Sequence, residues 1–542
     1  MLRSVRRLCA ALGAVSALSC APTARFVDAP PVVAVDDMAS IPEPKEHPYL
    51  VVSYFGDVLL WGRIDRALKL PTSHPSEDIN AIDEVPDSSW FTNRIGQRAL
   101  TPEEVARGPE KGGPPQLPLT VTSGKSGGAN PGFIAKDKTG RAFLIKFDPK
   151  SDFEVQTAAD IVTSRLLWAV GYNVPSDYAL TIRRDQLKLD PKAKNHDAEG
   201  NKIPFSEEAL DRIIATSPEA PPEAGGHPLF GGDRQMRVVA SQLLDGKPKG
   251  GWLGRGRRPD DPNDRIDHEN RRVLRGLRIF AAWLDHTDMK EDNTLDMYVE
   301  ENGRKFLKHY LVDFGESLGG HASEKGRMED GYEYIIDWAN QGKALLALGL
   351  WKRPWEDRHL SPHRGIGPLT TNLFDPVTWR EAYPYWPFFE TDAADAFWAA
   401  RIMARIDRSH VEAVVNAAHL SSPDSTKYFI EALMARHERV LRAFFEAVSP
   451  LDEFTVENGA LCATDLSARH KLARQGDIEL LDDRDAVVDT RPVGLDGRGC
   501  VRLPRTAYSV NRVRIRRGNE AHPWLEVHVR DRERVVGIVR TK

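Results

Sequence analysis

The sequence predicts an α+β chain in which a β-rich part comes first, a longer helical part follows, and a small β module ends the protein. Three observations support this order. Short apolar runs separated by turn residues occupy 119–147, apolar residues at helical spacing dominate from 273 to 447, and apolar–polar alternation returns after residue 450. With 542 residues, 41% hydrophobic and 28% charged, the chain has a globular composition and the length of about three to four domains.

The charge balance limits the partners that the chain can take. Lys and Arg total 74 against 79 for Asp and Glu, which gives a net charge of −5. There is no basic excess of the kind that neutralises phosphates, so we expect no nucleic acid partner. The composition also excludes a disordered chain, a collagen-like repeat and a polytopic membrane protein.

The first twenty residues have the pattern of an export signal. Three arginines within the first seven residues precede an apolar run over 8–18, which is shorter than the roughly 20 residues of a membrane-spanning helix. The run ends in Ala-Leu-Ser-Cys, which resembles a bacterial lipobox. This resemblance implies cleavage before Cys20, its acylation, and attachment to a membrane of the bacterial envelope, outer membrane expected, on the periplasmic or exposed side. A plain signal peptide with a chance cysteine is the alternative.

Turn residues and hydrophobic spacing place the elements of the first half. A helix is expected near Leu59–Leu68, and a Gly/Pro-rich linker at 108–118 precedes the first strands. A polar, Pro-rich insertion from Ser217 to Gly232 is expected to be a surface excursion. The expected strands and helix are Leu119–Thr122, Phe133–Lys136, Ala142–Phe147, a helix over 155–170, Tyr178–Ile182 and Arg237–Leu243.

The second half changes from helix to hairpin, back to helix, and then to strands. Apolar residues from Val273 to Leu284 form one helical stripe. Two strand-like runs, Leu295–Val299 and Phe306–Val312, flank a Glu-Asn-Gly turn. Residues 331–447 are helical and aromatic-rich in pattern, and the final β alternation is typical of a small β module.

Three separate pieces carry residue types suited to phosphoryl transfer. A Gly-rich turn, Gly124-Lys125-Ser126-Gly127-Gly128, lies between strands and permits close approach of backbone N–H groups to phosphates. A lysine, Lys146, ends the third strand before a helix that opens with Glu154. The run His-Thr-Asp-Met-Lys-Glu-Asp-Asn over 286–293 is followed, after the hairpin, by Asp-Phe-Gly at 313–315. Phosphoryl transfer needs such positioned acids, amides and cations more than covalent chemistry.

In register, the third piece reads His-x-Asp-x-Lys-x-x-Asn and then Asp-Phe-Gly, so the sequence resembles the protein-kinase-like superfamily. The resemblance covers about residues 119–320 by motif and looks closest to atypical HipA-like, CotH-like and secreted kinase-like branches. It implies a two-lobed fold with a small β-rich N-lobe and a larger, mainly helical C-lobe. It also implies the cofactors ATP and Mg²⁺ or Mn²⁺. By this resemblance Gly124, Gly127, Gly128 and Lys146 would contact the nucleotide phosphates, and Glu154 or else Asp160 would pair with Lys146. Asp288 would be the catalytic base, and Lys290 would contact the transferred phosphate. Asn293 and Asp313 would bind the metal.

The sequence also departs from the family pattern. Thr287 stands where many kinases have an arginine that senses activation-loop phosphorylation, and no Ala-Pro-Glu follows Asp313. The expected function is phosphoryl transfer from ATP to a hydroxyl of an unknown acceptor by an exported, lipid-anchored protein. The alternative is a non-catalytic kinase-fold lipoprotein that acts as a binding or structural module, because the bacterial periplasm is not expected to hold an ATP pool.

Two cysteines remain in the body of the chain. Cys462 and Cys500 form either a disulfide or two buried free thiols, and the sequence leaves both open. The expected domain organisation is a signal peptide with lipobox at 1–20, a tether at 21–48, an N-terminal extension and linker at 49–118, an N-lobe with insertion at 119–250, a C-lobe at 251–447 and a β module at 448–542.

Overall fold

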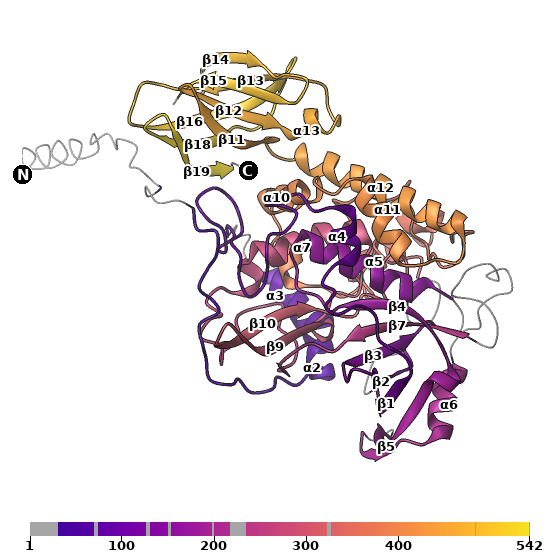
Figure 1. Ribbon diagram of the computed structural model, residues 1–542. Coiled ribbons are helices and arrows are strands. Elements are labelled where there is room, and N and C mark those ends of the chain that lie inside the picture. Colours follow the sequence, from indigo (N-terminus) through magenta and orange to yellow (C-terminus); the bar gives the residue numbers. More distant parts are fainter. Residues whose placement is uncertain are drawn as a thin grey trace, which may run out of the picture. The chain divides into compact units, whose positions relative to one another are not determined.

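Figure 1 shows the computed structural model, which describes residue 26 and residues 31–69, 74–125, 130–149, 153–197, 200–216, 235–321, 327–482 and 484–540. The predicted leader with Cys20, the loop glycines Gly127 and Gly128, and the insertion at 217–232 lie outside these ranges. Within the described ranges, no helix is both long and apolar enough to cross a membrane. The chain divides into two compact units, one of residues 33–79 and 85–447, the other of residues 1–32, 80–84 and 448–542.

The β-rich lobe of the larger unit is a seven-stranded sheet with the order β4-β7-β3-β2-β1-β5-β6 (Figure 1). Neighbouring strands are antiparallel except β1 and β5, which are parallel. The strands are β1 Leu119–Gly124, β2 Gly132–Lys136, β3 Ala142–Phe147, β4 Asp177–Arg183, β5 Leu187–His196, β6 Lys202–Pro204 and β7 Gln235–Gln242.

The alternation of side chains along β3 determines which face of the sheet carries the site. Phe143, Ile145 and Phe147 are buried in one core cluster, together with residues of helix α6 (Glu207–Ala215). Because successive side chains of a strand point to opposite faces, Lys146 faces the other side, where helix α5 (Val155–Val170) lies.

The helical lobe is built around α7 (Arg272–Leu284), in which 12 of the 13 residues are buried. A helix with so little exposed surface is a core element rather than an amphipathic surface helix. Trp283 Nε1 donates a 2.9 Å hydrogen bond to the carbonyl of Leu433, which fixes α12 against α7. The other helices of this lobe are α8 Trp338–Leu346, α9 Trp386–Phe389, α10 Ala393–Met403, α11 Arg408–Ala417 and α12 Pro423–Phe445, with the 3-10 turns η5 His268–Asn270, η6 Glu291–Asn293 and η7 Pro354–Asp357.

The predicted hairpin after α7 is confirmed. Strands β9 (Thr294–Glu301) and β10 (Arg304–Leu311) pair antiparallel, and a short strand, β8 (Lys247–Pro248), adds to β9. Asn302 and Gly303 form the turn with φ of 52° and 74°, the left-handed geometry that a two-residue hairpin loop requires. The hairpin therefore connects the Asp288 loop to Asp313.

The second part of the predicted tether is packed. Residues 33–48 of the segment 21–48 are part of the larger unit and contact its other elements. Ile41 donates its N–H to the carbonyl of Lys305 at 2.8 Å, and Glu43 pairs with Lys247 and Lys249 at 2.6 and 2.7 Å. These partners lie more than 200 positions along the chain, so no local sequence signal reports them. Next come α2 Val51–Gly56, the π-helical turn η2 Asp57–Trp61, α3 Gly62–Leu68 and, further on, α4 Pro102–Arg107.

The C-terminal β module, described by itself, has two sheets. One has the order β11-β12-β15 and the other β14-β13-β16-β18-β19, with β17 paired to β16. Along β16, burial alternates from residue to residue, so one face supplies the core that Val513 and Ile515 join. The elements are β11 Leu451–Glu457, β12 Ala460–Asp465, α13 Leu466–Arg469, β13 Asp477–Leu481, β14 Val487–Pro492, β15 Arg498–Arg502, β16 Tyr508–Arg517, β17 Glu520–Ala521, β18 Leu525–Arg530 and β19 Arg534–Arg540.

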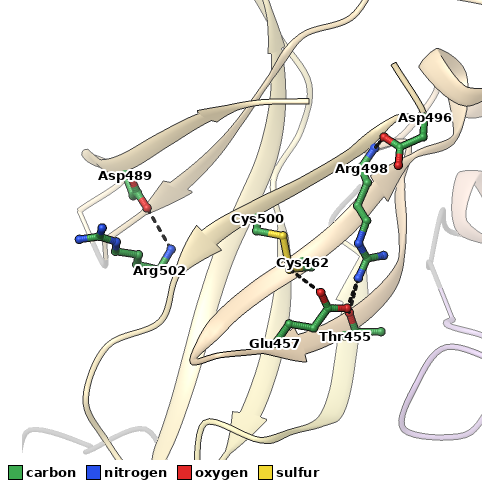
Figure 2. Close-up of a disulfide and its surroundings, with 8 residues drawn as sticks. All are labelled: Thr455, Glu457, Cys462, Asp489, Asp496, Arg498, Cys500 and Arg502. Carbon is green, nitrogen blue, oxygen red and sulfur yellow. Dashed lines mark hydrogen bonds and ion pairs between the residues drawn. A yellow bond between two sulfur atoms is a disulfide. The ribbon is translucent and has the colours of Figure 1, made fainter. Parts of the chain in front are cut away.

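Cys462 and Cys500 form a disulfide, which settles the alternative that the sequence left open (Figure 2). The two residues are directly opposite each other on the antiparallel strands β12 and β15. The bond therefore ties two neighbouring strands of the smaller sheet. The predicted fold class, an α+β chain with a β-rich lobe, a larger helical lobe and a C-terminal β module, is confirmed.

Candidate functional site

Lys146 is the cation around which the site is organised. It lies on β3, between β2 and β7, and is only 5% exposed. Its Nζ lies 2.8 Å from Asp160 Oδ2 and 2.9 Å from Asp313 Oδ1. Burial alone lowers the pKa of Lys146, but the two carboxylates outweigh that effect and raise it, so the ammonium stays charged.

Asp160, not Glu154, is the helix residue that pairs with Lys146. Asp160 lies inside α5, where its Oδ1 also accepts a hydrogen bond from the N–H of Phe314 at 2.8 Å. Glu154 is the residue just before α5, in a left-handed conformation with φ 77°. Its carboxylate accepts from the N–H and hydroxyl of Ser421, both at 2.9 Å. The expectation that Glu154 belongs to the nucleotide site through Lys146 is therefore wrong, and the alternative partner, Asp160, is confirmed.

Asp288 lies in the loop between α7 and β9 and is buried. Its Oδ2 accepts from Lys290 Nζ at 2.9 Å and from Asn293 Nδ2 at 2.7 Å. Its Oδ1 is buried and has no hydrogen-bond donor among the described residues. One oxygen of this carboxylate is therefore held in place by neighbours, while the other is free to accept a proton from a bound hydroxyl.

Lys290 connects this loop to an aromatic surface. Burial lowers its pKa, but the nearby Asp288 carboxylate raises it by more, so the side chain is charged. Its Nζ lies 5.6 Å from the ring centroid of Tyr383. Ring contacts continue from Tyr383 to Phe55 at 5.5 Å and from Phe55 to Tyr54 at 5.3 Å, which brings α2 beside the loop.

The backbone around Asp288 is anchored by a carboxylate that sequence reasoning missed. Asp285 ends α7 in a left-handed conformation with φ 49° and is buried. Its Oδ1 accepts from Trp379 Nε1 at 2.9 Å, and its oxygens lie 3.3 Å from guanidinium nitrogens of Arg358 and Arg436. Only its place next to the His286 loop could have pointed to it, since the three partners follow it by 70 to 150 positions.

The pKa of Asp313 is lowered by the lysines of the site. Lys146, Lys125 and Lys290 all lower the pKa of Asp313, Lys146 most strongly, to about 2. The residue has a left-handed φ of 59°, a conformation that costs energy for any residue but glycine. Val312, just before it, donates its N–H to the carbonyl of Asn293 at 3.0 Å. This bond holds Asp313 next to the Asp288 loop.

The residues predicted to hold a metal fit a hard divalent cation in their chemistry. Asp313 is ionised at neutral pH, and its side chain is 44% exposed. Asn293 uses its amide nitrogen towards Asp288, which leaves its amide oxygen as the atom that can coordinate. Among the described residues no group of three or more His, Cys, Asp or Glu side chains forms a ready-made metal site.

The Gly-rich turn is only partly described. Gly124 ends β1, and a Cβ there would lie 2.0 Å from Asn195 Oδ1 on β5, so a larger residue would require the Asn195 side chain to move. Lys125 donates from Nζ to the carbonyl of Asn130 at 3.1 Å, and burial lowers its pKa. The assignment of Gly127 and Gly128 to phosphate contacts stays a prediction, because both lie outside the described residues.

A cavity of about 640 Å³ opens beside the same loop. It is lined by Tyr54 and Val58 from the N-terminal helices, by Tyr385 and Trp386, and by Glu291, which follows Lys290. His47 holds Glu291 through a 3.0 Å contact between Nε2 and Oε1. The contribution of α2 to this cavity escaped the sequence reasoning, because α2 gives no motif that relates it to the distant loop.

Comparison with known proteins gives matches to solved structures only. No family model matches the chain, and no curated protein matches it. Among solved structures, it is similar to the crystal structure of the Golgi casein kinase with Mn/ADP bound, at 10% identity and a TM-score of 0.31, over 64% of this chain and 74% of that chain. A second structure of the Golgi casein kinase gives 10% identity, a TM-score of 0.30 and coverage of 64% and 75%. A TM-score near 0.3 is weak, so the roles given below rest on side-chain geometry.

Proposed function

We propose that this protein binds ATP with Mg²⁺ or Mn²⁺ and transfers the γ-phosphoryl group to a hydroxyl of an acceptor. The observation that carries the proposal is the pairing of two opposite features. Lys146 contacts Asp313 at 2.9 Å, and Lys125 and Lys290 lower the pKa of the same carboxylate, which suits a polyphosphate with its metal. Asp288 keeps one buried oxygen without a donor among the described residues. A polyanion site and a poised base are the two requirements of phosphoryl transfer.

In this proposal the side chains have separate roles. Lys146, fixed between Asp160 and Asp313, holds phosphate oxygens of the nucleotide. The hydroxyl oxygen of the acceptor bonds to the γ-phosphorus while the bond between that phosphorus and the ADP oxygen breaks. Asp288 Oδ1 accepts the proton that leaves the hydroxyl. Lys290 neutralises charge on the transferred group. A divalent cation bound at Asn293 and Asp313 would supply charge neutralisation at the phosphate oxygens.

The acceptor would enter from the side of Tyr383 and the cavity that Tyr54 lines. The cavity is beside Glu291 in the same loop as Asp288, and Lys290 contacts Tyr383. A volume of about 640 Å³ is that of a small-molecule pocket. The narrower placement in a HipA-like, CotH-like or secreted branch stays a prediction.

We also propose that the protein is exported and lipid-anchored at Cys20. Support comes from the sequence alone, through the arginines, the apolar run and the lipobox-like end of the leader. Metabolic labelling with palmitate should mark the parent chain and not Cys20→Ser. A parent chain that is unlabelled and freely released would rule the anchor out.

The test of the phosphotransfer proposal is nucleotide-dependent stabilisation of the purified chain. At 100 times its dissociation constant, ATP with Mn²⁺ or Mg²⁺ should add about 2.7 kcal/mol to the free energy of unfolding. Asp313→Ala should abolish this increment. Asp288→Asn should keep it and lose transfer of labelled phosphate, and Asp485→Asn, an exposed change in the β module, should alter neither.

Two results would contradict the proposal. A folded chain with no stabilisation by nucleotide and metal would remove the nucleotide site, and stabilisation unchanged in Asp313→Ala would remove the metal assignment. Stabilisation without any transfer, in the parent and in Asp288→Asn alike, would favour the non-catalytic alternative.

A further inference from the structure

The N-terminal helical segment and α8 leave a large set of apolar side chains in solvent. On η2 and α3, Leu60, Trp61, Ile64 and Leu68 recur at helical spacing and share one side of the segment. Trp61 is 64% exposed and Leu68 is 78% exposed. We call these four residues, together with Trp338, Leu345, Leu346, Leu348 and Leu350 at and after α8, the apolar face.

The two parts of the apolar face belong to neighbouring segments. Trp338 Nε1 donates to the carbonyl of Leu59 at 3.3 Å, and the Arg63 guanidinium lies 5.1 Å from the ring centroid of Tyr334. Beyond this junction the chain continues as Ala-Leu-Leu-Ala-Leu-Gly-Leu-Trp over 344–351, with Leu346 86% and Leu350 91% exposed. Single exposed leucines are common in soluble proteins, but a cluster of this size marks an interaction surface.

We propose that the apolar face docks on the surface of an anionic lipid bilayer. Charge complementarity separates this occupant from others. Residues 338–355 contain three cations, Lys343, Lys352 and Arg353, and no acid; residues 59–69 contain three cations and one acid, Asp65. Three of these six cations pair with acids outside the two stretches, Lys69 with Glu390, Lys352 with Asp357 and Arg353 with Glu333, so the excess that remains comes from Lys343, Arg63 and Arg66. Leucines in the centre with lysines and arginines beside them are the pattern of an interfacial segment.

Tryptophans lie where a bilayer interface would hold them. Trp338 begins α8 and Trp351 ends the leucine run, so the exposed leucines lie between two indoles. Lys343 Nζ lies 5.7 Å from the ring centroid of Trp351. Tryptophan is enriched at the boundary between lipid tails and headgroups, because its ring is apolar and its N–H is polar.

The docking also bears on the cavity beside the Asp288 loop. The N-terminal helical segment lines the 640 Å³ cavity through Tyr54 and Val58, so docking would bring that cavity near the lipid headgroups.

The test uses the mature chain that begins at residue 20, with Cys20→Ser so that no acyl chain contributes. Sedimentation with vesicles of phosphatidylglycerol and phosphatidylethanolamine measures binding. The triple variant Leu346→Gln, Leu348→Gln, Leu350→Gln should bind at least about tenfold more weakly, because three apolar side chains leave the bilayer. These leucines are 86–91% exposed, so the variant should keep the parent's thermal midpoint and nucleotide response.

A matched control carries the same chemistry elsewhere. Val377→Gln, Val488→Gln, Leu495→Gln changes residues that are 55%, 58% and 93% exposed and should bind vesicles within about twofold of the parent. A second variant, Lys343→Gln with Lys352→Gln, should lose binding to anionic vesicles and keep the weaker binding to phosphatidylcholine vesicles.

Three results would overturn the proposal. They are no vesicle binding by the parent, an equal loss in the control triple variant, and concentration-dependent self-association that the leucine variant abolishes. The last result would assign the apolar face to a second copy of the chain. Nucleotide-dependent stabilisation is measured on the same samples, so failure of this proposal is distinguishable from failure of the phosphotransfer proposal.

Discussion

Asp160 and Glu154 make a matched pair for testing which acid supports Lys146. Both are buried acids at the start of the same helix, and both precede the Asp288 loop by more than 120 positions. Only Asp160 contacts Lys146, at 2.8 Å, and it also accepts from the N–H of Phe314. The changes Asp160→Asn and Glu154→Gln keep shape and remove one negative charge each.

The expected magnitudes differ because the partners differ. Removing one partner of a buried ion pair costs about 3–5 kcal/mol, since the other charge stays buried. Asp313 still pairs with Lys146 in Asp160→Asn, and the asparagine oxygen still accepts from Phe314, so we expect the lower end, about 3 kcal/mol. In Glu154→Gln the amide oxygen still accepts from the Ser421 N–H, and the new NH₂ group can donate to the Ser421 hydroxyl. The 4.0 Å contact between the carboxylate and the buried Arg237 is lost, but Arg237 keeps its bonds to Thr157 and to two backbone carbonyls, so we expect a cost of about 1–3 kcal/mol.

Urea unfolding measures the free energy of unfolding, and stabilisation by ADP with Mn²⁺ measures the site. Asp160→Asn should lower the first and weaken nucleotide binding about tenfold or more, because Lys146 is no longer held on both sides. Glu154→Gln should bind nucleotide like the parent. Nucleotide binding weakened equally by both changes, or unaltered by Asp160→Asn, would refute the assignment of Asp160 as the supporting acid.

Two further outcomes follow from buried groups elsewhere. Burial raises the pKa of Asp177 from 3.8 to about 7, so the folded state binds this proton more tightly than the unfolded state does. The free energy of unfolding therefore falls as the pH rises from about 4 through 7, by up to about 1.4 kcal/mol per pH unit. Asp177→Asn should flatten that dependence in thermal melts from pH 5 to 8, and a parallel fall in variant and parent would contradict it. The Cys462–Cys500 disulfide closes a 38-residue separation, so Cys462→Ala with Cys500→Ala should cost about 4 kcal/mol, and reductant should destabilise the parent but not the variant.

The strands and helices that frame the site could be predicted because their signals are local. The alternation around Lys146 and the helical spacing after Val273 report burial within a few residues, and β3 and α7 appear where they were expected. In contrast, β5 and the short helix α6 were missed. Along β5 only Leu187 and Ala193 are buried, so the strand has no apolar alternation to detect.

The errors at the site have one physical cause, which is contact between distant segments. Glu154 was named first because it opens the predicted helix, although it follows Lys146 by only eight residues; it lies before α5 begins, whereas Asp160 is a full turn and more inside the helix. The packed course of 33–48 depends on contacts of Glu43 with Lys247 and Lys249, and the cavity is formed by Tyr54 of α2 together with Tyr385 and Trp386. The hydrophobic periodicity of one segment does not indicate which distant segment it contacts.

Asp285 and Asp288 differ in how their carboxylate oxygens are hydrogen-bonded. Asp285 has all its donors in place, and its role is complete without a ligand. Asp288 keeps Oδ1 buried without a donor, which costs about 1–3 kcal/mol and stabilises nothing in the fold itself. A loop with only a structural role gains nothing from that cost, whereas a base needs the free oxygen. In the phosphotransfer proposal this free oxygen takes the proton of the acceptor hydroxyl, and the objection from an exported location concerns the supply of ATP rather than the residues that would use it.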